Sequence, residues 1–124
     1  GMVGDLPVPQ DSMEFLLRIK EIFHCGALRY TTPHKTLIQR VALCGGSGSF
    51  LLKTAIREKA DIYISGDFKY HDLFNTENKI IIADIGHYES EQYTKEIFYE
   101  LLIKKIANFA VRFSESNTNP INYL

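Results

Sequence analysis

The sequence predicts an α/β domain, a layered fold with a largely parallel central sheet flanked by helices. Apolar, β-branched runs of strand length alternate with segments in which apolar residues recur at helical spacing. The connections are short, so strands joined through a helix are expected to run parallel. A chain of 124 residues has the length of one domain with a single core.

The chain is expected to begin with an extended segment at residues 1–10, because two prolines and two glycines there exclude a helix. We interpret this segment as a lead-in from an upstream domain and place the α/β domain at residues 11–124. From Ser12 the apolar residues follow helical spacing, with Asp11 or Ser12 as the N-cap. Gly26 is expected to end this helix.

The middle of the chain repeats the alternation of strands and helices. In chain order, the expected elements are a strand at 28–31, a buried strand at 39–44, a helix at 50–56, a strand at 61–65, a short helix at 69–75 and a strand at 79–83.

The longest helix is expected at residues 89–109, and residues 114–124 are expected to be irregular or edge structure. A stripe of apolar side chains on this helix should be buried. Its members are Ile97, Phe98, Leu101, Leu102, Ile106 and Phe109. The opposite, solvated face would carry Lys95, Glu100, Lys104 and Lys105.

Three polar, glycine-containing loops follow the expected central strands, at residues 45–49, 66–71 and 84–91. In α/β sheets of this kind, ligands bind in the crevice beyond the carboxyl ends of the strands. The loops should therefore meet at one edge of the sheet, which is where we place a candidate site.

In the last of these loops, His87 and Glu91 are the candidate metal ligands. Residues four apart on a helix face the same way, so an imidazole nitrogen and a carboxylate could reach one cation. This donor pair suits Zn, Mn, Fe or Ni, which it does not distinguish. The alternative is structural, with Glu89 and Glu91 complementing the helix dipole and Glu91 pairing with Lys95. Further ligands could come from Asp67, His71, Asp72 and Asp84.

The other two loops offer candidates for chemistry on a substrate. Asp67, Lys69 and His71 could bind substrate or transfer protons, although a capped short helix would explain the same residues. The loop at 45–49 could present backbone amides to an anion, yet it lacks the lysine of a P-loop. Its Ser47 is a weak candidate for an esterase nucleophile, and a tight turn is the structural alternative.

Composition excludes several classes of function. The net charge of −1 and the scattered basic residues do not favour binding to nucleic acid or to an anionic membrane. No apolar run has the length of a membrane-spanning helix. The two cysteines, Cys25 and Cys44, form no CxxC motif and suggest a reduced, cytoplasmic protein.

Taken together and in order, the motifs Val41–Ser49, Gly66–His71 and Asp84–Glu91, with Asn119-Pro120-Ile121 in the tail, resemble the Nif-three-like family. Members of that family are widely labelled GTP cyclohydrolase type 2 homologues. The resemblance implies two similar α/β halves that enclose a dinuclear metal centre, with subunits assembled into hexamers. This chain resembles the carboxy-terminal half only.

The resemblance implies that His87 and Glu91 are metal ligands. The remaining ligands of the family, including a His-His-Pro motif, belong to the amino-terminal half, and this chain contains no His-His pair. We therefore expect an incomplete metal site and no activity in this segment alone. We also expect the surface that meets the missing half to associate with other copies.

Two hypotheses from different classes follow. The first is a metal-dependent hydrolase acting on a nucleotide-like substrate, in which a metal activates water. The second is a metal-binding or regulatory interaction protein without catalytic activity. An esterase dependent on Ser47 is a third, least favoured alternative.

Overall fold

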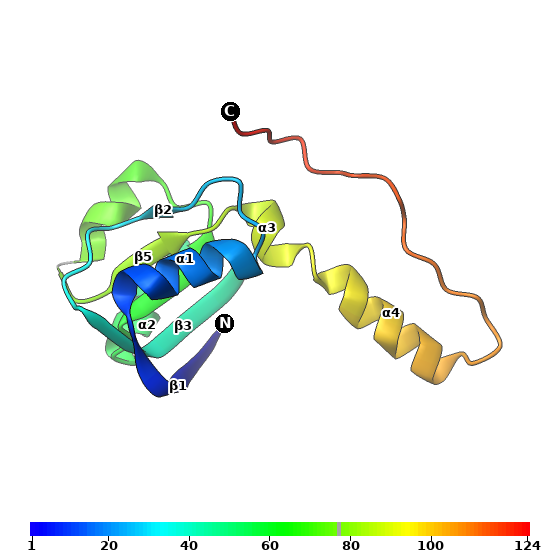
Figure 1. The fold of residues 1–124 in the computed structure, drawn as a ribbon, viewed down its shortest axis with the longest axis horizontal. Coiled ribbons are helices and arrows are strands. Elements are labelled where there is room, and N and C mark those ends of the chain that lie inside the picture. Colours follow the sequence, from blue (N-terminus) through cyan, green and yellow to red (C-terminus); the bar gives the residue numbers. More distant parts are fainter. Residues whose placement is uncertain (77) are drawn as a thin grey trace.

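The computed structural model describes residues 1–76 and 78–124. In these residues a five-stranded sheet has the order β1-β3-β4-β5-β2. The three central strands are parallel, namely β3 (Leu37–Ser47), β4 (Ile62–Gly66) and β5 (Ile81–Asp84). The edge strands β1 (Met2–Asp11) and β2 (Arg29–Tyr30) are antiparallel to their neighbours. The predicted α/β fold with a largely parallel central sheet is confirmed (Figure 1).

The extended segment expected at residues 1–10 is the edge strand β1, which pairs with β3. The register shifts between Asp5 and Gln10, the interval that contains both prolines. Because proline has no backbone N–H, it is tolerated where a strand leaves its ladder. This strand belongs to the same sheet as the rest of the chain, and its origin in an upstream domain stays a prediction.

Helices cover the two faces of the sheet. On one face lies α1 (Ser12–Ile22), whose first turn is capped by the Asp11 side chain. On the other lie a 3-10 turn, η1 (Ser49–Leu51), and α2 (Leu52–Arg57). The expected helices at these positions are confirmed, although α1 ends at Ile22 rather than at Gly26.

The core consists of two clusters, one on each face of the sheet, because successive strand side chains point to opposite faces. The cluster beneath α1 contains Phe15, Leu16, Ile19, Cys25, Ile38, Ile62, Ile64, Ile81, Ala83 and Ile85. The cluster beneath α2 contains Ala42, Leu52, Ala55, Ala60, Tyr63, Phe68, Ile80 and Ile82. The sheet and its flanking helices therefore bury a substantial core by themselves.

The prediction of one long, partly buried helix at residues 89–109 is wrong in two respects. It is two helices, α3 (His87–Glu91) and α4 (Thr94–Lys105), separated at Gln92 and Tyr93. The predicted apolar stripe is also exposed, and no residue from 92 to 124 is buried. The physical reason is that α4 leaves the sheet, so no element of the described chain covers its apolar side chains (Figure 1).

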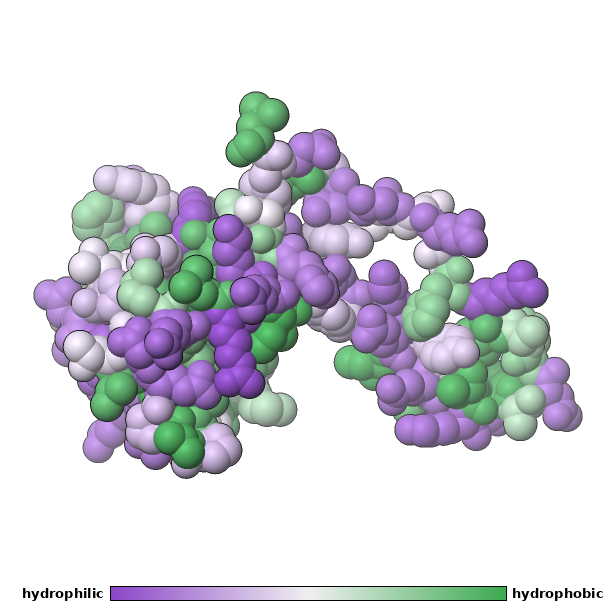
Figure 2. All heavy atoms as spheres, viewed as in Figure 1, coloured by the Kyte–Doolittle hydropathy of each residue, from purple (hydrophilic) through white to green (hydrophobic). Residues whose placement is uncertain are grey.

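The start of α4 is nevertheless fixed against the end of α1. The Gln92 side-chain amide donates to the Phe23 carbonyl oxygen at 2.9 Å, and the Tyr93 hydroxyl donates to the Ile22 carbonyl oxygen at 2.6 Å. The rings of Phe23 and Tyr93 pack edge to face with centroids 6.2 Å apart. Figure 2 shows α4 as a separate lobe with many hydrophobic atoms on the visible face.

The remaining segments connect these elements. The short helix expected at residues 69–75 is a 3-10 segment, η2 (Tyr70–Thr76). Residues 106–124 contain neither helix nor strand, which confirms the prediction of an irregular tail. The tail returns to α3 at Tyr123, whose hydroxyl donates to Oε1 of the buried Glu89 at 3.2 Å.

Candidate metal-binding site

The three loops predicted to meet at one edge of the sheet do so. The Gly46 amide donates to Ser90 Oγ at 2.7 Å, which joins the end of β3 to α3. The Ser65 hydroxyl of β4 donates to the Gly46 carbonyl oxygen at 3.1 Å. Ser90 Oγ in turn donates to the His87 carbonyl oxygen at 2.8 Å. These hydrogen bonds fix α3 across the carboxyl ends of the central strands.

Two glycines permit this close approach. Gly46 has a φ of 65°, and a Cβ atom there would lie 2.5 Å from Glu91 Oε1. At Gly66, a Cβ atom would lie 2.8 Å from the Gly86 carbonyl and 2.9 Å from the His87 nitrogen. Side chains at these positions would collide with the entry to α3 and with the Glu91 carboxylate.

The candidate ligands His87 and Glu91 lie at the first and last positions of α3. His87 Nε2 is 3.2 Å from Glu91 Oε2, as expected for side chains four residues apart. The side chains are about half exposed, at 49% for His87 and 52% for Glu91. Lys95, the alternative partner considered for Glu91, forms no ion pair with it among the described residues.

The other nitrogen of the His87 ring faces Asp67. His87 Nδ1 is 2.6 Å from Asp67 Oδ2, and the Asp67 side chain is also half exposed. The hydrogen bond to Asp67 raises the pKa of His87, and the negative charges of Asp67 and Glu91 act in the same direction. The imidazole thus stands between two carboxylates, one at each ring nitrogen.

The loop that carries Asp67 is held from several sides. Asp67 itself has a φ of 59°, a left-handed conformation that aspartate tolerates better than most residues. The buried Phe68 ring packs edge to face on Tyr63 with centroids 5.8 Å apart. Arg29 donates to the Phe68 carbonyl oxygen at 2.9 Å and forms an ion pair with the buried Asp84.

The other predicted site residues of this loop lie apart from the pair. Lys69 and His71 are exposed, and no hydrogen bond or ion pair in the described part of the chain joins their side chains to His87 or Glu91. Asp72 accepts a hydrogen bond from the Lys69 amide at 3.0 Å and so caps the turn. The structure thus brings Asp67 to the pair, while Asp72 and Asp84 have structural partners.

The donor set present here fits part of a transition-metal site. His87 and Glu91 offer one nitrogen and one oxygen donor that face each other. Among the described residues, however, no group of three or more His, Cys, Asp or Glu side chains could hold a metal ion. The two side chains open into a cavity of about 580 Å³ between α3, the start of α4 and the tail. The described residues thus offer two candidate ligands but no group of three.

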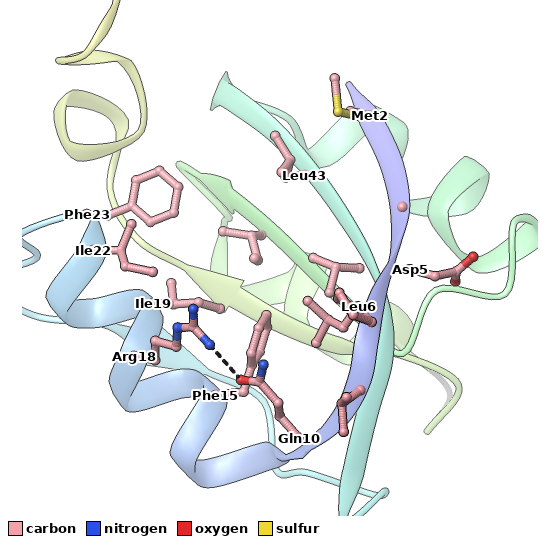
Figure 3. Close-up of a pocket in the computed structure, with 15 residues that line it drawn as sticks. Met2, Asp5, Leu6, Gln10, Phe15, Arg18, Ile19, Ile22, Phe23 and Leu43 are labelled. Carbon is pink, nitrogen blue, oxygen red and sulfur yellow. Dashed lines mark hydrogen bonds between the residues drawn. The ribbon is translucent and has the colours of Figure 1, made fainter.

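A second cavity of about 580 Å³ lies between α1 and β1 (Figure 3). Its walls are mostly apolar, with labelled residues such as Leu6, Phe15 and Ile19 pointing inward. Arg18 donates to Gln10 Oε1 at 3.3 Å at its rim. Neither His87 nor Glu91 lines this cavity, so it is separate from the candidate ligands.

Sequence reasoning missed two residues that support the site. Ser90 lies within the quoted motif, three residues after His87, so its role in fixing the helix could have been suspected. Arg29 comes from β2, far from the motifs in sequence, and no local signal connects it to Asp84 or Phe68. Ser47, the candidate nucleophile, is exposed, and no hydrogen bond joins its hydroxyl to a histidine in the described residues.

Comparison with known proteins identifies the family. The model of the family described as Duf34/NIF3 (NGG1p interacting factor 3) matches residues 1–120. The chain belongs to the Duf34/NIF3 family. This confirms the resemblance inferred from the three motifs.

Curated Duf34/NIF3 relatives are considerably longer than this chain. A Staphylococcus epidermidis protein named GTP cyclohydrolase 1 type 2 homolog is 34% identical over 128 residues, covering 99% of this chain but 35% of the relative. A Campylobacter jejuni protein of the same name is 35% identical over 107 residues, covering 85% of this chain and 42% of the relative. The chain therefore spans well under half the length of these relatives.

Solved structures that match this chain are also considerably longer than it. The crystal structure of Staphylococcus aureus protein SA1388 matches with a TM-score of 0.84 and 25% identity, over 98% of this chain and 41% of that one. A Bacillus cereus protein related to NIF3 matches in fold with a TM-score of 0.81 and 23% identity, over 98% of this chain and 35% of that one. These matches include α4, because they cover nearly every residue. No described helix of the present chain has the length and apolarity to cross a membrane.

Proposed function

We propose that this chain is the carboxy-terminal part of a dinuclear metal-binding protein that acts as a metal-dependent hydrolase on a nucleotide-like substrate. One observation carries the proposal. His87 Nε2 and Glu91 Oε2 face each other at 3.2 Å, half exposed, at the strand-end edge where α/β proteins bind ligands. The relatives named GTP cyclohydrolase 1 type 2 homolog support a nucleotide-like substrate.

The chemistry divides between the metal and the side chains of this chain. A bound divalent metal would supply a Lewis acid and lower the pKa of a coordinated water. His87 and Glu91 would hold it. The exposed Lys69 and His71, on the segment that follows β4, remain available to bind a phosphate group or transfer a proton.

A metal-binding or regulatory interaction protein without catalytic activity is the second candidate. The family description includes the words "interacting factor", which support a role in association. The exposed apolar side chains of α4 would suit such a role. In this case the metal would stabilise the assembly rather than a reaction.

The same apolar surface leads to a proposal about the partner. It comprises Ile97, Phe98, Leu101, Leu102 and Ile103, which are 40–61% exposed. Structural matches covering 98% of this chain include α4, yet leave more than half of the relatives' length unmatched. We assign this surface to the missing amino-terminal half, with a hexamer of complete subunits as the expected assembly.

Metal content tests the ligand assignment. In the full-length protein, His87→Ala and Glu91→Ala should each reduce bound transition metal, measured by elemental analysis after purification without chelator. His34→Ala is the matched control, because His34 is exposed and lies far from the site in sequence. Full metal occupancy in both the His87 and the Glu91 variants would reject the assignment.

Turnover separates the two candidate functions. The metal-loaded full-length protein should hydrolyse a member of a panel of purine nucleotides, and His71→Ala should lower the rate while leaving the metal in place. If no nucleotide in the panel is turned over by fully metallated protein, the non-catalytic role is favoured.

Association tests the partner surface. Light scattering on this 124-residue chain should show self-association that Leu101→Glu reduces. Co-expression with the missing amino-terminal half should convert the chain into a defined complex. A monomeric chain that fails to bind that half would contradict the assignment of α4.

A further inference from the structure

We infer that Asp67 is a positioning residue for the metal ligand His87, rather than a metal ligand or a general base. This inference rests on the proposed metal site, because it concerns how one of its ligands is presented. It concerns the loop after β4, and it changes the role that the sequence suggested for Asp67. Its basis is the distance of 2.6 Å between Asp67 Oδ2 and His87 Nδ1.

The geometry determines which imidazole nitrogen is available to a metal. A neutral imidazole carries one N–H, and its other nitrogen has the lone pair that binds a cation. Both ring nitrogens of His87 face a carboxylate, and the contact at Nδ1 is the shorter one, at 2.6 Å against 3.2 Å. We therefore assign the N–H of the neutral ring to Nδ1 and the lone pair to Nε2. Nε2 is the atom that faces Glu91 at 3.2 Å. The hydrogen bond to Asp67 therefore directs the lone pair of His87 toward the second candidate ligand.

This contact also argues against the two other roles for Asp67. Its oxygen lies at the opposite ring nitrogen from Glu91, so Asp67 and Glu91 do not face one common point beside the ring. An oxygen already engaged by His87 is poorly placed to take a proton from a substrate. Histidine ligands commonly donate their second N–H to a carboxylate, which orients the ring.

The loop holds Asp67 in place before any metal arrives. The buried Phe68 next to it packs on Tyr63, and Arg29 binds the Phe68 carbonyl oxygen. Arg29 is itself paired with Asp84 at the end of β5. Asp67 is thus supported by the two strands adjacent to its loop, β4 and β5. A carboxylate fixed in this way can restrict the imidazole to one orientation.

Two substitutions at position 67 remove or weaken the contact with His87 with little backbone strain. Glycine adopts a φ of 59° readily and removes the carboxylate, whereas asparagine also tolerates this φ and retains a neutral oxygen. In the full-length protein, Asp67→Gly should weaken Zn²⁺ affinity by about 10–100-fold, the usual cost of losing such a partner. Asp67→Asn should give an intermediate loss. Affinity would be measured by competition with a chelating dye.

The tautomer of His87 gives a readout that a purely structural role would not move. In metal-free protein at a pH where His87 is neutral, ¹⁵N NMR should show the proton on Nδ1 in the wild type. In Asp67→Gly the proton should shift largely to Nε2. Asp72→Asn is the matched control, because it neutralises a carboxylate of the same segment that contacts the Lys69 amide.

The outcomes separate this inference from the metal site itself. If His87→Ala abolishes Zn²⁺ binding but Asp67→Gly binds within twofold of wild type, the positioning role is overturned and the site stands. If His87→Ala also retains Zn²⁺, the site itself is wrong. A proton on Nε2 in the wild type would overturn the inference, as would an equal loss of affinity in Asp72→Asn.

Discussion

Residues 1–91 and residues 92–124 make opposite use of their apolar side chains. The first region forms the sheet with α1, α2 and α3 and buries two clusters of apolar residues, one on each face. The second region contains α4 and the tail, and none of its residues is buried. A similar share of large apolar residues therefore gives a core in one region and an exposed surface in the other.

The difference shows that residues 1–91 pack a core of their own, whereas α4 has no packing partner among the described residues. Helical packing requires a second apolar surface, which the sheet provides for α1 but no described element provides for α4. The matches to solved relatives span 98% of this chain, and those structures extend well beyond the matched region. The sheet region should therefore account for most of the stability of this chain, and α4 should add stability only when its partner is present.

The largest expected effect is in the sheet core. Ile81→Ala, at a fully buried position of β5, should lower the free energy of unfolding by about 2–5 kcal/mol. Leu101→Ala on α4, 47% exposed, should change it by less than about 0.5 kcal/mol. Urea unfolding followed by circular dichroism measures both. Equal losses at a protein concentration where the chain is monomeric would show that α4 packs against its own chain, and they would contradict the comparison.

A smaller loss of unfolding free energy is expected on substitution of Asp61, which joins the starts of the central strands β3 and β4. Its carboxylate accepts from the amides of Gln39 and Arg40 at 2.9 and 2.8 Å and from Lys35 Nζ at 2.5 Å. Asp61→Asn should cost about 1–3 kcal/mol, because three donors lose the charge of their nearly buried acceptor. Glu100→Gln on α4, which breaks only the exposed pair with Lys104, should cost about 0–0.5 kcal/mol.

The contribution of Asp61 to stability should depend on pH. Burial alone would raise the pKa of Asp61, but the hydrogen bonds from Arg40, Lys35 and Gln39 hold it below its usual value of 3.8. The folded pKa is thus below the unfolded one, so this stability is present above the unfolded pKa and disappears as the pH falls through the folded pKa. Unfolding curves should show the gap between wild type and Asp61→Asn narrowing below about pH 4. A gap that is constant from neutral to acid pH would contradict this.

The smallest effect is expected where the two regions touch. Tyr123→Phe removes the hydroxyl that donates to Glu89 and should cost about 0.5–1.5 kcal/mol. Tyr99→Phe, in the same region, serves as the control, because no hydrogen bond among the described residues joins the Tyr99 hydroxyl to residues 1–91. If both variants have wild-type stability, the tail is not attached in solution.

Local pattern was sufficient to predict the central strands and the proximity of His87 and Glu91. The β-branched runs before residues 44, 65 and 83 became the three parallel strands, and the loops after them met as expected. The spacing of four between His87 and Glu91 placed them together because helix geometry is local.

Long-range contacts could not be predicted in the same way. Nothing in the sequence near Gln92 and Tyr93 marks the break between α3 and α4, because neither residue is a glycine or a proline. The break is instead stabilised by contacts with Phe23 and Ile22, some seventy residues earlier. The apolar period of α4 showed that it has a face for packing but could not show what would cover it.

The chain segment that contains α4 is attached to residues 1–91 at both of its ends, which limits how far the helix can move. Tyr93 and Tyr123, on either side of the helix in sequence, both form hydrogen bonds with residues 1–91. The helix is therefore attached to the rest of the chain before its first residue and again through the tail. A tethered helix samples few orientations, and much of the entropy that docking would otherwise consume is already lost. Cutting the chain within residues 106–122 should therefore slow the capture of a partner even though no apolar contact residue is removed.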